Sequence, residues 1–110
     1  MSKYYDNHYA EMKVQPLEVM QEMLNISEFA AFLMGNVVKY HLRAGHKQGE
    51  AISKDIDKRD RYLSWLYYLW NGGLYINPKL DYELDEEFKN MVLNKIDKTY
   101  AELLSKKSKD

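Results

Sequence analysis

No cysteine occurs in this 110-residue chain, which excludes disulfides, thiolate nucleophiles and thiolate metal ligands. Proline is scarce as well, at two residues, so long stretches are free to form helices. No apolar run approaches the roughly 18 residues that a membrane span needs, and the first residues hold no apolar signal segment. We therefore expect a soluble, intracellular protein.

Charge is balanced overall but unevenly distributed along the chain. The net charge is −1, from 16 Lys and Arg against 17 Asp and Glu, which makes nucleic acid or a membrane surface an unexpected partner. Residues 39–61 are mildly basic, whereas residues 81–87 contain five acids and no cation. A basic region and an acidic region are thus separated along the sequence.

The apolar periodicity is helical throughout and predicts an all-α fold, a compact bundle of about four helices. A short helix begins at Pro16, and a second covers 28–44 with Ser27 as its N-cap. A third covers 53–70 and stops at Gly72-Gly73, and a fourth covers 82–104.

These elements predict one domain. Residues 1–73 form its helical core, and residues 74–110 add a connector, the last helix and a disordered Lys-rich end. The apolar and aromatic faces of the last two helices predict a homo-oligomer.

A polar stripe lies along the predicted helix 28–44. At about 100° per residue, one narrow sector collects two apolar residues and then three polar ones, with Lys39 at its edge. In order these are Phe29, Leu33, Asn36, Tyr40 and Arg43. The other sides of this helix are largely apolar, so the stripe must face partner groups or a ligand.

Cations from two helices are predicted to converge at this stripe. Lys39, Arg43 and Lys47 follow the second helix and its exit, while Lys58 and Tyr62 share a side of the third helix with Asp55. Arg and Lys in a helical hairpin suit capture of a phosphate or carboxylate. The structural alternative is that Arg43 and Lys58 pair with Asp55 and a carboxylate such as Glu18 to lock the helices together.

Familiar catalytic motifs are missing from the chain. It contains no phosphate loop, no Gly-x-Gly-x-x-Gly and no Gly-x-Ser-x-Gly. No metal site is predicted, since no carboxylate stands at ligand spacing with His41 and His46. His41 lies opposite the cations and is predicted to be structural. Trp65 and Trp70 are predicted to be core or interface residues and not base-stacking platforms.

Four blocks of residues, in this order and spacing, resemble the DUF3310 (SaV-like) family of small bacteriophage proteins. The blocks, which cover roughly residues 6 to 70, are Asp6-Asn7-His8-Tyr9, Gln15-Pro16-Leu17-Glu18-Val19-Met20, Gly35-Asn36-x-x-Lys39-Tyr40-x-x-Arg43-Ala44-Gly45-x-Lys47, and Asp55-x-x-Lys58-x-x-x-Tyr62-Leu63. The chain departs from the family pattern at Asp6-Asn7, where Pro is frequent, and at Arg59, where Ala is frequent.

The resemblance implies a phage accessory protein in the cytoplasm of the infected bacterial host. Some relatives are described as nucleoside monophosphate kinases without a phosphate loop, and another is linked to a host abortive-infection system. Carried over by position, the ligand-binding residues would be His8, Tyr9, Asn36, Lys39, Tyr40, Arg43, Lys47, Lys58 and Tyr62. Asp55 would be the candidate catalytic group, and a kinase would use Mg²⁺.

Two other function classes remain open. The protein could be non-catalytic and bind a host or anti-phage defence protein through its Tyr-rich start or through residues 81–87, since Tyr is favoured at interfaces. Alternatively, it could be a structural oligomer whose polar motif only fixes the subunit register.

Overall fold

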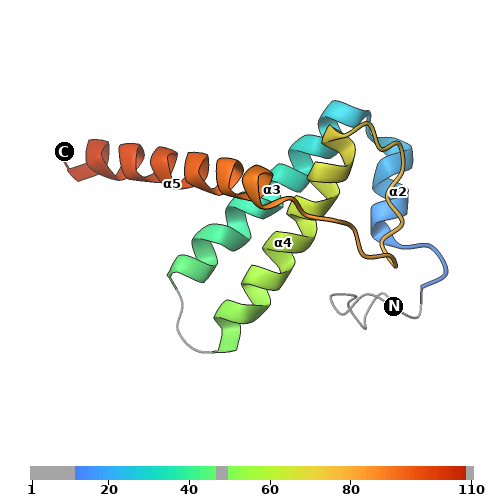
Figure 1. Cartoon of the computed structure of the whole chain (residues 1–110), viewed down its shortest axis with the longest axis horizontal. Coiled ribbons are helices and arrows are strands. Elements are labelled where there is room, and N and C mark those ends of the chain that lie inside the picture. Colours follow the sequence, from blue (N-terminus) through green and yellow to red (C-terminus); the bar gives the residue numbers. More distant parts are fainter. Residues whose placement is uncertain (1–11, 47–49, 109–110) are drawn as a thin grey trace.

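The computed structural model describes residues 12–46 and 50–108, and this part of the chain is helical without a strand. Its helices are α2 (Pro16–Met23), α3 (Ile26–Gly45), α4 (Glu50–Trp70) and α5 (Glu86–Ser108). In Figure 1, α3 and α4 run side by side, α2 lies at one end of the pair, and α5 crosses it. The predicted all-α fold of four helices is confirmed. Within the described residues, no helix has the length and apolarity to cross a membrane.

Helix α3 begins at a reciprocal cap two residues before the predicted one. The Asn25 side chain accepts a hydrogen bond from the Glu28 backbone N–H at 2.9 Å, and the Glu28 carboxylate accepts one from the Asn25 N–H at 2.9 Å. These two bonds satisfy donors that the first turn of a helix leaves unpaired. The prediction of Ser27 as N-cap was wrong because Asn25 and Glu28 together make a complete capping box.

The α3–α4 hairpin carries the centre of the core. Leu33, Val37 and Leu63 are completely buried, and Phe29 is 3% exposed. Helix α4 begins at Glu50, three residues before the predicted Ser53, so it pairs with α3 along most of its length. The predicted polar stripe therefore lies on the well-packed α3–α4 hairpin.

Helix α4 stops at two glycines, as the sequence predicted. Gly72 has φ of 88°, a conformation that favours glycine, and the Gly73 N–H donates to the Tyr68 carbonyl at 2.9 Å. A Cβ at Gly73 would lie 2.4 Å from the Tyr68 ring, so the chain can turn here only without a side chain.

The connector after α4 is packed against α2. The Gln21 side chain donates to the Ile76 carbonyl and accepts from the Ile76 N–H, both at 2.8 Å. The Ile76 side chain is completely buried. The sequence predicted only a connector here; the structure makes it part of the core.

Helix α5 begins at Glu86 and not near Tyr82, because the Asp85 carboxylate accepts from the Phe88 N–H at 2.9 Å and caps the helix there. It continues to Ser108, four residues beyond the predicted end at Leu104, and so includes Lys106 and Lys107 of the Lys-rich end.

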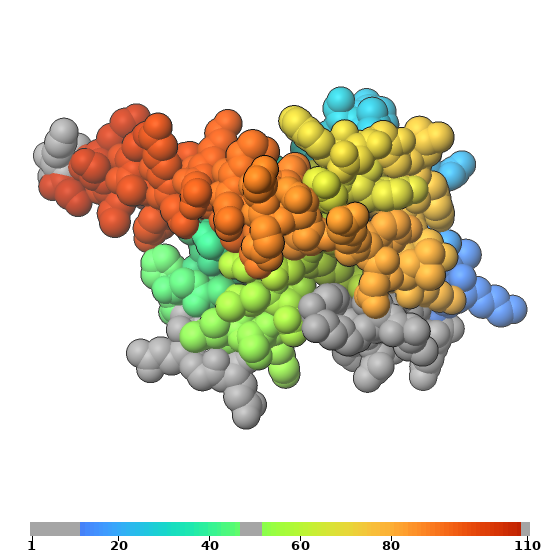
Figure 2. Space-filling view, in the orientation of Figure 1, coloured from blue at the N-terminus to red at the C-terminus, as the bar shows by residue number. Residues whose placement is uncertain are grey.

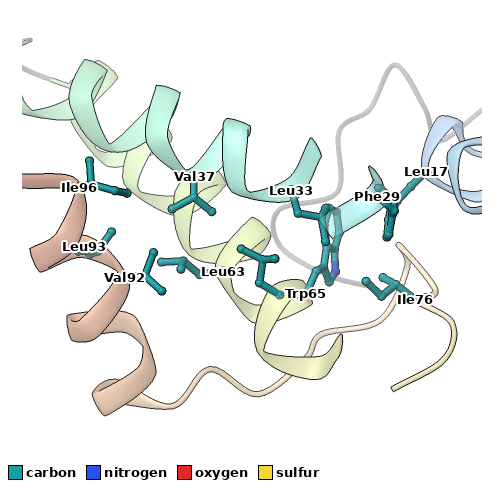
Figure 3. Packing of buried hydrophobic residues seen from close by; sticks show 11 residues of the cluster. Leu17, Phe29, Leu33, Val37, Leu63, Trp65, Ile76, Val92, Leu93 and Ile96 are labelled. Atoms are coloured by element: carbon teal, nitrogen blue, oxygen red, sulfur yellow. The ribbon is translucent and has the colours of Figure 1, made fainter. Parts of the chain in front are cut away.

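Among the described residues, the buried apolar side chains of α5 all lie in its first half. Val92, Leu93 and Ile96 pack against the hairpin, near Val37 and Leu63 (Figure 3). The second half projects past the hairpin, at the left of Figure 2.

Candidate anion-binding site

Three cations from α3 and α4 surround the ring of Tyr40. The ammonium of Lys39 lies 4.6 Å from the ring centroid, and the guanidinium carbon of Arg43 and the ammonium of Lys58 each lie 5.5 Å from it. All three cations are exposed, whereas Tyr40 is half-buried. The electron-rich face of an aromatic ring attracts cations at such distances, so the ring offsets part of their mutual repulsion.

One buried carboxylate stands behind these cations. The Arg43 Nε lies 3.8 Å from Asp55 Oδ2, and the Asp55 side chain is 4% exposed while that of Arg43 is 48% exposed. Neither Lys39 nor Lys58 makes an ion pair with another described residue. Among the described residues, the positive charge here therefore exceeds the negative charge.

Aromatic contacts fix the ring of Tyr40 in place. Its partner is the Tyr62 ring, stacked at a centroid distance of 6.0 Å with an interplanar angle of 11°. Tyr62 in turn meets Trp65 edge-on at 5.2 Å, and Trp65 is 5% exposed. Because this series of ring contacts ends at a core residue, the ring of Tyr40 is held rigidly among the three cations. The name "Tyr40 cluster" below refers to six residues, Lys39, Tyr40, Arg43, Asp55, Lys58 and Tyr62.

The structure thus brings six of the ten predicted site residues together, all at the α3–α4 joint. Asn36 lies one turn before Tyr40, and its amide donates to the Phe32 carbonyl at 3.0 Å, a bond within its own helix. Its role in ligand binding stays a prediction. His8, Tyr9 and Lys47 lie outside the described residues.

The structural alternative is right about the Arg43–Asp55 pair and wrong about Lys58 and Glu18, which form no ion pair with one another or with Asp55 among the described residues. The Arg43–Asp55 pair is present, but the Glu18 carboxylate accepts from the Gln15 backbone N–H at 2.7 Å and from the Tyr75 hydroxyl at 3.3 Å. The Glu18 carboxylate therefore caps its own helix, α2, and contacts Tyr75 of the connector, so it does not join α3 to α4.

Metal-ligand groups do not gather anywhere in the described part of the chain. Residues 12–46 and 50–108 contain no group of three or more His, Asp or Glu side chains that could hold an ion. Asp55 is a single, deeply buried carboxylate. The described residues therefore do not fit a dedicated Mg²⁺ site, which usually needs accessible carboxylates beside the phosphates of a substrate.

His41 joins three helices on the other side of α3. Its Nε2 lies 2.7 Å from Asp97 Oδ1 on α5, and its Nδ1 lies 3.1 Å from Arg59 Nη1 on α4. Because the guanidinium can only donate, Nδ1 accepts and Nε2 carries the hydrogen given to Asp97. The structure agrees with the structural role predicted for His41.

The sequence reasoning missed Arg59, which is only 9% exposed. It also contacts Asp60 at 2.9 Å, and Lys89 contacts the same carboxylate at 3.3 Å. The available signal was its position on the apolar stripe of α4, between Ile56 and Leu63, where a cation is buried only if it has partners.

The two tryptophans differ. Trp65 is a core residue, as predicted. Trp70 is 73% exposed and meets Phe88 at a centroid distance of 6.1 Å, so it is not in the core. That Trp70 belongs to an interface stays a prediction.

Comparison with known proteins gives phage relatives. The chain is 37% identical over 82 residues to the SaV protein of Lactococcus phage SK1, covering 74% of this chain and 61% of that protein. It is 36% identical over 50 residues to nucleotide kinase gp1.7 of Escherichia phage T7, covering 44% of this chain and 26% of the relative. It is 35% identical over 60 residues to the gene 1.7 protein of Enterobacteria phage T3, covering 53% and 37%.

The matched stretch is therefore less than two thirds of each of these relatives. No solved structure matches the chain. The model of a family described as protein of unknown function, DUF3310, matches residues 3–64, and this range contains the whole Tyr40 cluster. Since that range is more than half of the sequence, the chain belongs to the DUF3310 family, together with these phage proteins.

Proposed function

We propose that this small phage-family protein binds a phosphate-bearing ligand, a nucleotide, at the Tyr40 cluster. The observation that carries the proposal is the gathering of Lys39, Arg43 and Lys58 around one ring, on an exposed surface with a single buried carboxylate. Like charges so close together repel, and a multiply charged anion is the ligand that relieves the repulsion. Phosphate oxygens fit this set, with Arg as a forked donor and two Lys as point charges.

Asp55 acts in this proposal as a positioning residue for Arg43. Its side chain is too deeply buried for ready contact with a ligand, while its Oδ2 lies 3.8 Å from the Arg43 Nε. This leaves the terminal nitrogens of the guanidinium available to an anion. The stacked rings of Tyr40 and Tyr62 provide aromatic surface beside the cations, which suits a ligand with a planar base.

A kinase activity is the finer form of the proposal. One relative is named a nucleotide kinase, at 36% identity over 50 residues. Phosphoryl transfer depends mainly on positioning and on neutralising the phosphoryl oxygens, which Lys39, Arg43 and Lys58 would do. Mg²⁺ would then be held chiefly by the phosphates of the donor nucleotide.

Thermal unfolding with a graded ligand series tests the binding proposal. We expect AMP and ATP with Mg²⁺ to raise the melting temperature and adenosine to have no effect, because the phosphate carries the binding. A ligand at 100 times its dissociation constant stabilises the folded state by about 2.7 kcal/mol, a shift on the order of 10 °C. The nucleotide panel should extend to all the common bases.

Two variants locate the site. Arg43→Ala and Lys58→Gln should each lower the affinity about 10-fold or more, and Lys98→Gln, an equal loss of charge on the exposed side of α5, should leave it unchanged. Equal shifts with adenosine and AMP, or equal loss in Lys98→Gln, would argue against a phosphate site at the Tyr40 cluster.

A non-catalytic role in binding a host or defence protein is the second candidate. The observation that favours it is the acidic segment 81–87, in which Asp81, Glu83, Glu86 and Glu87 are exposed beside Leu80, itself 54% exposed. If no nucleotide shifts the melting temperature, this segment becomes the surface to mutate in searches for a protein partner.

A further inference from the structure

An apolar groove lies between α3 and α5, on the side of α3 away from the Tyr40 cluster. It is open and has a volume of about 770 Å³. Its α3 wall includes Ala31, Met34, Val38 and Leu42, and its α5 wall includes Met91 and Leu103. Open apolar surface of this extent on a small protein usually marks a contact with a partner. The name "α3/α5 groove" refers to this feature.

The groove continues toward the C-terminal end of α5, because this helix extends further than the α3–α4 hairpin that covers its first half. Val92 and Leu93 are 8% exposed and Ile96 is 9% exposed, whereas Leu103 and Leu104 further along are each 52% exposed. Successive positions at helical spacing place Ile96 and Leu103 on one face. Tyr100 on this face still contacts α3, with its hydroxyl 3.2 Å from His46 Nε2. Beyond Tyr100, the described residues leave the face at Leu103 half exposed, where α5 projects past the hairpin (Figures 1 and 2).

The charges on α5 indicate which occupant fits. Its first turn carries Glu86 and Glu87, and its last turn carries Lys106 and Lys107, all exposed. Two α5 helices lying antiparallel would place each acidic end beside a Lys-rich end, whereas a parallel pair would oppose like charges.

The same register brings apolar residues together. If Glu86 of one helix faces Lys107 of the other, Met91 lies at nearly the same level along the axis as Leu103 of the other helix, and both residues line the groove. Met91 is 55% exposed, so both members of this contact have surface to bury. In a two-fold arrangement each contact occurs twice, which makes the surface self-complementary.

We propose that α5 of a second copy of this chain binds antiparallel in the α3/α5 groove and forms a two-fold symmetric dimer. The proposal is independent of the proposed function, because Lys39 and Arg43 lie on the other side of α3. The sequence predicted self-association through the last two helices, α4 and α5; the proposal keeps α5 and assigns the other wall of the contact to α3.

Light scattering on the full chain is the first test. We expect a mass of twice 13.1 kDa at micromolar concentrations. Leu103→Glu should raise the dimer dissociation constant by about 30-fold or more, because it buries a charge in an apolar contact. Met23→Glu is the matched control: Met23 is 77% exposed on α2, away from the groove, and its substitution should leave the mass unchanged.

A charge exchange tests the antiparallel register and does not depend on any apolar substitution. The double variants Glu86→Lys/Glu87→Lys and Lys106→Glu/Lys107→Glu should each dissociate more readily than wild type, since each opposes like charges in both contacts. Mixed in equal amounts they should form a heterodimer, because every contact then pairs Glu with Lys. Circular dichroism on each variant checks that α5 remains helical.

Three results would overturn the proposal. The first is a wild-type chain that stays monomeric up to its solubility limit. The second is an oligomer whose dissociation is the same in Leu103→Glu and in wild type. The third is a pair of charge variants that dimerise as well alone as they do when mixed, which would exclude the antiparallel register.

Discussion

The two sides of α3 present opposite kinds of unsatisfied surface. One side, with Lys39 and Arg43, has more positive charge than its protein surroundings neutralise. The other side, with Met34 and Val38, forms the wall of an apolar groove that the single chain does not fill. A single helix thus has two surfaces of different chemistry, for which we propose an anion on one side and a hydrophobic helix on the other.

The difference between the sides follows from what each kind of surface can do. Water and salt screen the repulsion within an exposed cluster of cations only in part, so the cluster persists without a ligand but gains from binding an anion. An exposed apolar face gains from any cover, and the gain grows with the area buried. We therefore expect the groove to be occupied whenever the chain is concentrated, and the cluster only when ligand is present.

The largest expected effect on stability comes from removing a core contact of α3, the helix that carries both surfaces. Leu33 is completely buried within α3, so Leu33→Ala should lower the free energy of unfolding by about 3 kcal/mol through lost burial and a residual cavity. Ligand binding and dimerisation should then fail together as the fold weakens. Urea unfolding measures the loss.

Leu74→Ala provides the control for that experiment. Leu74 is 89% exposed, so the same chemical change should alter the free energy of unfolding by no more than about 0.5 kcal/mol. A loss of similar size in both variants would show that α3 is not the central support described above.

A smaller effect on stability should distinguish the buried cation Arg59 from the exposed cation Arg43. Arg59→Met removes the donors to the half-buried His41 and Asp60, of which Asp60 keeps Lys89, and it leaves the His41 acceptor without a partner, which should cost about 2 kcal/mol. The contact of His41 with Asp97 ties α5 to α3, so hydrogen exchange should accelerate most in α5.

Arg43→Met is the matched change on the other side. Arg43 is about half exposed and its single contact with the buried Asp55 is long, at 3.8 Å, so the loss should be smaller than in Arg59→Met, about 1 kcal/mol. Should the two Arg→Met variants lose equal stability, the distinction between a structural cation and a ligand-directed one would be unfounded.

The smallest expected effect is a pH dependence of stability at Tyr75, a residue that belongs to neither surface of α3. Partial burial and the neighbouring Glu18 carboxylate raise the pKa of Tyr75 above its usual 10.0. A raised pKa means that folding favours the protonated hydroxyl, so its contribution to stability is complete below pH 10 and is lost as the pH rises through the folded-state pKa.

Urea unfolding of wild type and Tyr75→Phe from neutral to strongly alkaline pH checks this. The wild type should be the more stable near neutrality, and the difference should shrink and vanish at alkaline pH. A difference that stays constant would mean that the bond to Glu18 does not form.

Local rules in the sequence predicted much of this molecule. Helical periodicity gave four helices, and Gly72-Gly73 marked the end of α4. The spacing of Tyr40, Arg43 and Lys58 was enough to predict their convergence, because two long helices with a short link pack side by side.

What the sequence did not reveal depends on contacts between distant residues. The caps at Asn25 and Asp85 were missed because several polar residues near each helix start could serve, and only the backbone path selects one. The burial of Arg59 requires His41 from another helix. The open second half of α5 cannot be foreseen either, since its apolar pattern is that of an ordinary covered helix.

The clamp between Gln21 and Ile76 has a consequence for how this chain can be altered. A carboxamide that binds both backbone groups of one residue recognises a position in the chain and not a side chain. The five residues between Trp70 and Ile76 therefore have a fixed length, and an insertion there would pull the turn at Gly72 or break the clamp. An insertion directly after Ile76 would meet a similar constraint, because the Asn77 N–H donates to the Tyr82 hydroxyl at 2.8 Å and the Arg61 guanidinium donates to the Pro78 carbonyl.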